Sequence, residues 1–260
     1  MINEFSRYAH PLKKIMVKFT NKLRKQRYRL TADLRFLLRS LMTIFLIQQL
    51  LRLAYMIATP TETIYLPFPI IAEAMYFGAR FDLMVSTWVC IPMIIAMAFP
   101  SGLRARSLWR AWLSFMGLFT IIAGIISISF YQLEGDAQGQ SFYVWLAQGD
   151  NIPWELLISR WESAIWLMVI VLFAGLLHEL VRASDLTCRN VGKETRAKRL
   201  GYFAVIVLVA TLSLRGTLHW GPPLKPEEAN FSSYVHANHI AANATFTVIR
   251  TRMRMAEAEH

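Results

Sequence analysis

The sequence predicts an all-α, polytopic membrane protein with five transmembrane helices, an N-terminus inside the cell and a C-terminus outside. Three observations support this fold class. Of the 260 residues, 55% are hydrophobic and only 17% are charged, whereas soluble domains carry about 25% charged residues. Apolar runs of roughly the 20 residues that cross a bilayer recur five times. Basic residues alternate between the connecting segments, which sets the orientation of the helices.

Each of the five apolar runs is expected to form one membrane-spanning helix. The mean hydropathy of the whole chain, +0.36, agrees with a chain that is largely embedded in lipid. Two neighbouring glutamines interrupt the first run, and we expect them to hydrogen-bond to other helices; they are Gln48 and Gln49. The predicted spans cover residues 36–58, 83–99, 112–131, 164–180 and 200–214.

Lysine and arginine residues orient the predicted bundle. The segment before the first span carries ten of them, the segment 100–111 carries three and the segment 181–199 carries six. The segments 59–82 and 132–163 carry one each. Because cationic loops stay in the cytoplasm, the last span is expected to leave the C-terminus outside. The net charge of +11 is therefore explained by sidedness and requires no nucleic acid.

Three parts are expected along the chain. A basic cytoplasmic segment covers residues 1–35, a five-helix transmembrane domain covers 36–214, and an extracytoplasmic linker with a surface helix covers 215–260. Short interfacial helices rich in tryptophan are expected on the outer side within 140–161. The surface helix is expected over 227–247, with one stripe formed by Phe231, Tyr234, Val235 and Ala242.

Residues that could carry chemistry are few. No nucleophile lies at a convincing spacing from a base, and no P-loop, zinc-binding or dithiol motif is present. His236 and His239 are three residues apart and would share a helix face, but a zinc site needs three or four ligands. We therefore expect no catalytic and no metal-binding residue in this chain, and packing roles for the two histidines.

Charged residues near the outer ends of the spans have two interpretations. In the first, they reach the lipid surface or form ion pairs, either Arg80 with Asp82 or Arg52 with Asp82. In the second, guanidinium groups hold the phosphate of an anionic lipid headgroup at the outer leaflet. In this second interpretation the substrate-binding residues are Arg80, Asp82, Arg215 and His219.

Four local patterns, in this order and with this topology, resemble one known family. They are FGARFDL at 77–83, LRG at 214–216, PPL at 222–224 and NHIAANATFT at 238–247. The chain from about residue 36 onward looks like the membrane half of the lipoteichoic acid synthase-like family. Its members are phosphoglycerol or phosphoethanolamine transferases of the bacterial cytoplasmic membrane, with an outer catalytic domain of the sulfatase superfamily.

The resemblance implies a membrane anchor that presents an anionic phospholipid headgroup to a catalytic domain, in cis or in trans. The family's catalytic threonine and its metal ligands match no residue here, so the divalent metal, by resemblance manganese, is expected only in an outer domain absent from this chain. Arg215 and Gly216 would form the exit hinge, with glycine allowing the bend. The family commonly has a second glycine where Thr217 stands.

A non-enzymatic membrane scaffold that docks a separate enzyme is the alternative function. A transporter is disfavoured because the sequence shows no internal repeat and its ionisable residues gather near the ends of the spans.

Overall fold

The computed structural model describes residues 32–99, 102–103, 105–134, 161–186, 196–216 and 225–247. This described part is helical and contains no strand, which confirms the all-α prediction for these residues. Residues 1–31 of the predicted basic segment, residues 140–160 of the predicted interfacial helices, and His219 lie outside the described residues, whereas residues 32–35 already belong to the first membrane helix. The helices are α2 (Ala32–Ala58), α3 (Pro60–Ile64), α4 (Phe68–Met97), α5 (Arg106–Glu134), α8 (Trp161–Leu186), α9 (Arg196–Arg215), the 3-10 helix η1 (Pro226–Ala229) and α10 (Val235–Ala241).

Three of these helices, α2, α4 and α5, are long and apolar enough to cross a membrane. They have 27, 30 and 29 residues, and at about 1.5 Å per residue each is about 40 Å long or more. They correspond to the first three predicted spans, and α8 and α9 are helical over the fourth and fifth. The chain is therefore a helical protein of the membrane class, and the count of five crossings and their orientation remain predictions.

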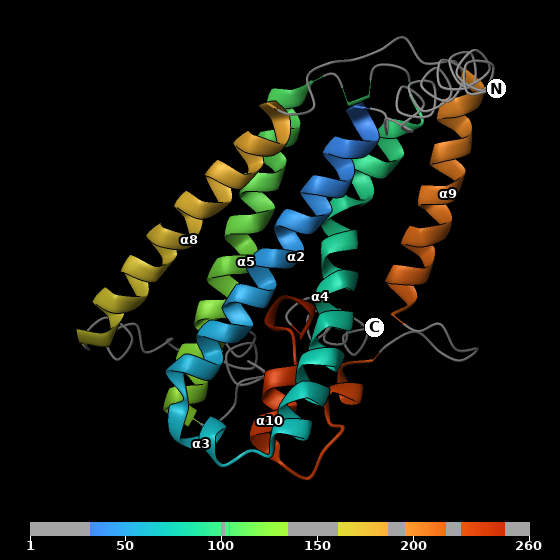
Figure 1. Cartoon of the computed structure of the whole chain (residues 1–260). Helices are drawn as coiled ribbons and strands as arrows, with labels where there is room; N and C mark the ends of the chain where they lie inside the picture. Colours follow the sequence, from blue (N-terminus) through green and yellow to red (C-terminus); the bar gives the residue numbers. More distant parts are fainter. Residues whose placement is uncertain are drawn as a thin grey trace, which may run out of the picture.

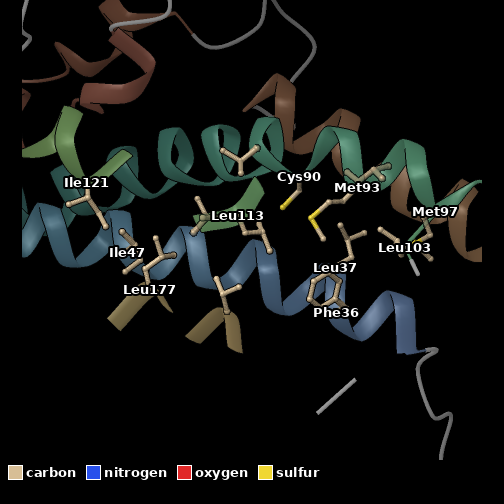
Figure 2. Packing of buried hydrophobic residues seen from close by; sticks show 14 of the residues in the cluster. Phe36, Leu37, Ile47, Cys90, Met93, Met97, Leu103, Leu113, Ile121 and Leu177 are labelled. Carbon is tan, nitrogen blue, oxygen red and sulfur yellow. The ribbon is translucent and has the colours of Figure 1, made fainter. Parts of the chain in front are cut away.

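The long helices stand side by side in one bundle (Figure 1). Helix α2 lies at its centre and packs against α4, α5 and α8, whereas α9 packs mainly on α4. Figure 2 shows how the facing side chains of α2, α4, α5 and α8 fill the space between these helices. The fully buried members of this core include Phe36, Ile44, Ile47, Cys90, Met93, Leu113, Ile121 and Leu177.

Helix α4 begins much earlier than the second predicted span. It starts at Phe68, so the prediction that a loop continues to Asp82 is wrong. The apolar run that defined the span begins only at residue 83, but the preceding turns contain no proline after Pro69, which lies in the first turn where proline is tolerated. Arg80 and Asp82 are consequently helical residues in the interior of α4.

The predicted single surface helix over 227–247 is also wrong. The chain forms η1, then a turn, then the seven-residue α10, and a further helical turn at 244–247. The amide side chain of Asn238 closes the turn by accepting from the Ser232 N–H at 3.0 Å and donating to the Ser232 carbonyl at 2.8 Å. The expected apolar stripe is absent, since Tyr234 and Val235 are 44% and 64% exposed.

We call residues 225–247 the docked segment, because they pack into one end of the bundle. In Figure 1 this segment, coloured red, lies against the first half of α4, near the end of α2. A second apolar core joins it to the bundle. Its buried members are Tyr55, Leu66, Ala74, Phe81, Met84, Val85, Ile128, Ala229, Ala237, Ile240, Ala241 and Phe246.

Helix α9 ends at Arg215, and Gly216 follows with a φ of 68°. The Gly216 N–H donates to the carbonyls of Leu212 and Ser213 at 3.2 and 3.0 Å, which closes the last turn. Residues other than glycine adopt this left-handed conformation at a cost of about 1 to 2 kcal/mol. Helix α9 therefore closes at Gly216 in a conformation that glycine favours, and the expected exit hinge stays a prediction because residues 217–224 lie outside the described residues.

Replacing Gly216 with alanine is expected to lower the free energy of unfolding by about 1 kcal/mol. The measurement is thermal unfolding of the purified protein in detergent. Gly201→Ala in the same helix is the control, because a Cβ there meets no atom within 4 Å and alanine favours a helix by about 0.5 to 1 kcal/mol. Equal transitions for the two variants would contradict this account of the bend.

Candidate functional site

A cluster of six polar side chains lies inside the bundle where the docked segment meets α2 and α4. All are buried except Gln49, which is half-buried. Polar groups in such surroundings are stable only when each finds a partner, and most of these groups find partners within the cluster. We call this set the polar cluster: Gln48, Gln49 and Arg52 of α2, Asp82 and Ser86 of α4, and Asn243 of the docked segment.

The carboxylate of Asp82 is the centre of the polar cluster. Its Oδ1 accepts from Nη2 of Arg52 at 2.7 Å and from Nδ2 of Asn243 at 2.6 Å. Its Oδ2 accepts from Nε2 of Gln49 at 2.6 Å. Asp82 has no exposed surface, so these three donors and the guanidinium charge replace the water that an ionised carboxylate would otherwise need.

The guanidinium of Arg52 connects α2 to the docked segment. Its Nη1 donates to the backbone carbonyls of Ile240 and Ala242, the latter at 3.1 Å. The same group packs against Gly78 of α4, where a Cβ atom would overlap the guanidinium. Glycine at this position therefore allows Arg52 to reach both the carboxylate of Asp82 and the docked segment.

Asn243 fixes the depth at which the docked segment enters the bundle. Its Nδ2 donates to Oε1 of Gln48 at 2.5 Å as well as to Asp82. Its Oδ1 accepts from the Phe246 N–H at 2.8 Å, which caps the helical turn at 244–247. Nε2 of Gln48 donates to Oγ of Ser86 at 3.0 Å. The prediction that Gln48 and Gln49 hydrogen-bond to another helix is confirmed: Gln48 bonds to Ser86 of α4, and Gln49 bonds to Asp82 of α4.

Aromatic contacts continue the attachment on both sides of the polar cluster. The ring of Phe246 lies 5.2 Å from that of Phe81 and 5.8 Å from that of Trp88, measured between centroids. The rings of Phe77 and Phe231 stack at 5.0 Å. Such pairs contribute about 0.5 to 1.5 kcal/mol each beyond the burial of their area, so α4 holds the docked segment at two levels.

His236 attaches α10 to the end of α2. Its ring stacks on Tyr55 with centroids 5.4 Å apart. Its Nε2 lies 3.0 Å from Oγ1 of Thr63 and 3.4 Å from Oγ1 of Thr59. Burial lowers the pKa of His236 from its ordinary value of 6.5, and the carboxylate of Glu62 opposes this shift. The docked state therefore favours the neutral imidazole.

This lowered pKa predicts that docking weakens in acid. Below about pH 6.5 the undocked histidine takes a proton before the docked one does, so docking stability falls as the pH falls. A hydrogen bond from Thr61 lowers the pKa of Glu62, which therefore remains ionised in this range. Hydrogen exchange of residues 235–241, corrected for intrinsic rates, is expected to be faster at pH 5.5 than at pH 7.5. His236→Gln should remove this difference, and an unchanged difference would assign it to another group.

The structure decides between the two ion pairs that the sequence left open. Arg52 pairs with Asp82, and the Arg80–Asp82 pair is absent. Arg80 and Asp82 are two residues apart on a helix, so their side chains point in different directions. Asp82 accordingly faces the interior of the bundle, away from the surface site to which it was assigned.

Arg80 lies at the exit of α9. Its Nε donates to the carbonyl of Gly216 at 2.9 Å, and its Nη2 lies 3.9 Å from a carboxylate oxygen of Glu228. Its guanidinium also lies 5.3 Å from the ring centre of Phe77. The fold thus brings Arg80 beside the residue that follows Arg215, and the side chain of Arg80 keeps 21% of its surface exposed.

The two histidines of α10 lie in different surroundings. His236 contacts the ends of α2 and α3, whereas His239 lines a small pocket beside the polar cluster. Among the described residues no group of three or more His, Cys, Asp or Glu side chains is arranged to hold a metal ion.

Comparisons of this chain with family models, with curated proteins and with solved structures give no match. The class of protein is therefore defined by the fold and the site alone. It is a helical membrane protein in which a segment after the last described long helix docks into a buried polar cluster.

Proposed function

We propose that this chain is the membrane anchor of an envelope transferase that moves phosphoglycerol or phosphoethanolamine groups in the bacterial cytoplasmic membrane. Its second role in the proposal is to present a phospholipid headgroup to the catalytic unit. The observation that carries the proposal is the docked segment, which the polar cluster holds at a fixed position on the bundle. A transferase that takes its donor from the membrane requires such a fixed geometry between membrane helices and catalytic unit.

The attachment resists displacement because withdrawal of the docked segment removes partners from buried charges. Arg52 would lose the carbonyls of Ile240 and Ala242, and Asp82 would lose the amide of Asn243. Each buried polar group left without a partner costs about 1 to 3 kcal/mol. A segment held in this way keeps a fixed orientation relative to the bundle, and a catalytic unit attached to it would keep that orientation too.

The headgroup contact is proposed at the exit of α9. Arg80 donates a hydrogen bond to the Gly216 carbonyl, and Arg215 directly precedes Gly216 in the sequence. The guanidinium groups of both residues suit phosphate oxygens. Glu228 offsets part of the Arg80 charge, so the contact would be selective for a headgroup that can displace this weak 3.9 Å pair. The family's manganese has no ligand set among the described residues, and the proposal assigns it to the catalytic unit.

The test is the chemistry of the envelope in a strain that lacks the gene. Phosphorus NMR and mass spectrometry of envelope polymers should show the loss of a phosphoglycerol or phosphoethanolamine substituent, and the wild-type gene should restore it. The Arg80→Ala, Arg215→Ala double variant should restore it poorly at normal protein levels. An envelope that is unchanged in the deletion strain would exclude the transferase role.

A membrane scaffold for a separate enzyme is the second proposal. The exposed side chains of Tyr234 and Val235 on the docked segment support it, because they present apolar surface that the bundle does not cover. Under this proposal the Tyr234→Ser, Val235→Ser variant keeps its fold and loses a co-purifying protein. Normal envelope substituents in the deletion strain would favour the scaffold over the transferase anchor.

A further inference from the structure

The four most exposed large apolar side chains of the described residues belong to one corner of the fold. They are between 78% and 84% exposed and occur where α2 ends, α3 follows and α4 begins. In Figure 1 this corner, marked by α3, lies at the end of the bundle far from the start of α2. Exposed apolar surface of this kind marks a site of interaction. We call this set the apolar corner: Ile57, Ile64, Tyr65 and Phe68.

The backbone of the apolar corner is held in place by hydrogen bonds, so its side chains are not exposed by a loose loop. The Thr63 N–H donates to the Thr59 carbonyl at 3.1 Å, and the Leu66 N–H donates to the Thr63 carbonyl at 3.2 Å. Pro60 and Pro67 restrict the backbone where α3 and α4 begin. Leu66 itself is buried in the second apolar core. The fold therefore presents the apolar corner as a preformed surface.

The exposed face of α2 measures the depth of this corner in a membrane. Arg39 is exposed, and the rise along the helix from Arg39 to Ile57 is about 27 Å, close to the roughly 30 Å of the hydrocarbon layer. Because a guanidinium group stays at the polar boundary of that layer, Ile57 lies at the opposite boundary. Every exposed side chain of α2 beyond Arg39 is apolar, and these are Met42, Leu46, Leu53 and Ile57.

The length of α4 gives the same depth independently. Its 30 residues extend about 45 Å, and a bilayer with both headgroup layers is about 40 to 45 Å thick. Phe68 is the first residue of this helix and Met97 is the last. An α4 that crosses the bilayer thus places Phe68 in an interfacial layer. Tyr65 suits the same layer, because its ring is apolar and its hydroxyl can reach water.

The charges near the apolar corner fit an uncharged partner. The segment 53–79 contains no lysine or arginine, and its two acidic residues are Glu62 and Glu73. Glu62 and Ile64 are two residues apart on α3, so their side chains point to different sides of this short helix. The corner therefore offers apolar and aromatic side chains to the edge of the acyl chains and offers no cation to a phosphate.

We infer that the apolar corner inserts into the interfacial layer of the bilayer, where its partner is the boundary between the lipid esters and the acyl chains. Arg52 lies about 7.5 Å along α2 from Ile57, on the side of the hydrocarbon layer. The polar cluster is then just beneath the membrane surface, and the docked segment reaches it from that surface. This inference depends neither on the transferase and scaffold proposals nor on which leaflet contains the corner.

The experiment uses the full chain in liposomes of phosphatidylcholine, with one nitroxide label introduced as Ile64→Cys or Phe68→Cys. Cys188→Ser removes one natural thiol, and Cys90 can stay because it is fully buried. Electron paramagnetic resonance compares collisions of the label with oxygen, which concentrates among acyl chains, and with a nickel chelate, which stays in water. We expect the ratio of oxygen to chelate collisions at both positions to be several-fold higher than for Glu62→Cys.

Glu62→Cys is the matched control, because Glu62 is exposed on α3 and points away from Ile64. Circular dichroism checks that each labelled protein is folded, and a label at Tyr65 repeats the test if one of the others is not. Equal collision ratios at positions 62, 64 and 68 would overturn the inference and leave the apolar corner to a protein partner. Insertion that occurs only after phosphatidylglycerol is added would also overturn it, because an anionic headgroup would then be the partner.

Discussion

Replacing Arg52 with methionine is expected to destabilise the protein by about 3 to 5 kcal/mol, more than the loss of any other single contact between the bundle and the docked segment. Methionine fills a similar volume but leaves the carboxylate of Asp82 buried without its counter-charge. It also removes the donor to the carbonyls of Ile240 and Ala242. The docked segment should therefore detach, and its amides should exchange faster than those of α5.

The measurement is unfolding in a graded mixture of mild detergent and dodecyl sulfate, followed by circular dichroism. Arg182→Met is the control, because Arg182 forms an exposed pair with Glu179 at 3.7 Å and such pairs contribute less than about 1 kcal/mol. Adding Asp82→Leu to Arg52→Met should recover part of the loss, since the unpaired charge is then gone. Equal loss in the Arg52 and Arg182 variants would refute the central role of the buried pair.

Gly78→Ala is expected to have the second-largest effect, a loss of about 1 to 3 kcal/mol from overpacking. The added Cβ overlaps the guanidinium of Arg52, which is held on its other sides by Asp82 and by two backbone carbonyls. The guanidinium can move away only by breaking these bonds. The docked segment should loosen in this variant as it does in Arg52→Met.

Gly175→Ala provides the matched control on α8, because a Cβ there meets nothing within 4 Å. Alanine at this helical position should stabilise by about 0.5 to 1 kcal/mol, the opposite sign. In an Arg52→Met background, Gly78→Ala should cost much less than in the wild type, since the two residues act on one contact. If Gly78→Ala lowers the free energy of unfolding equally in both backgrounds, its effect does not arise from the contact with Arg52.

The helices could be located from the sequence because apolar runs of spanning length have one stable form in lipid. The first, third, fourth and fifth runs each lie within a helix of the structure. The start of α4 could not be located in this way, because residues 68–82 mix apolar residues with Glu73, Arg80 and Asp82 and fall below a simple hydropathy threshold. The docked segment was misjudged because its breaks depend on the side chain of Asn238, which competes with the helix through local hydrogen bonds.

The polar cluster could be predicted only in part. Gln48 and Gln49 were visible as polar residues within an apolar run, and Arg52 with Asp82 was one of two pairings the sequence allowed. The contribution of Asn243 could not be foreseen, because it lies 161 residues beyond Asp82 and its partners depend on how deeply the segment enters the bundle. Gly78 gave no signal of its own, since its importance comes from the path of one arginine side chain.

Photo-crosslinking from position 246 tests most directly whether the docked segment enters the bundle. A benzophenone amino acid replaces Phe246 in the full chain, the membranes are illuminated, and mass spectrometry locates the adducts. The structure predicts adducts on α4 at Phe81 and Trp88, and none on these residues from a probe at the exposed Tyr234. Adducts from position 246 on lipid alone, in a protein that folds normally, would contradict the account.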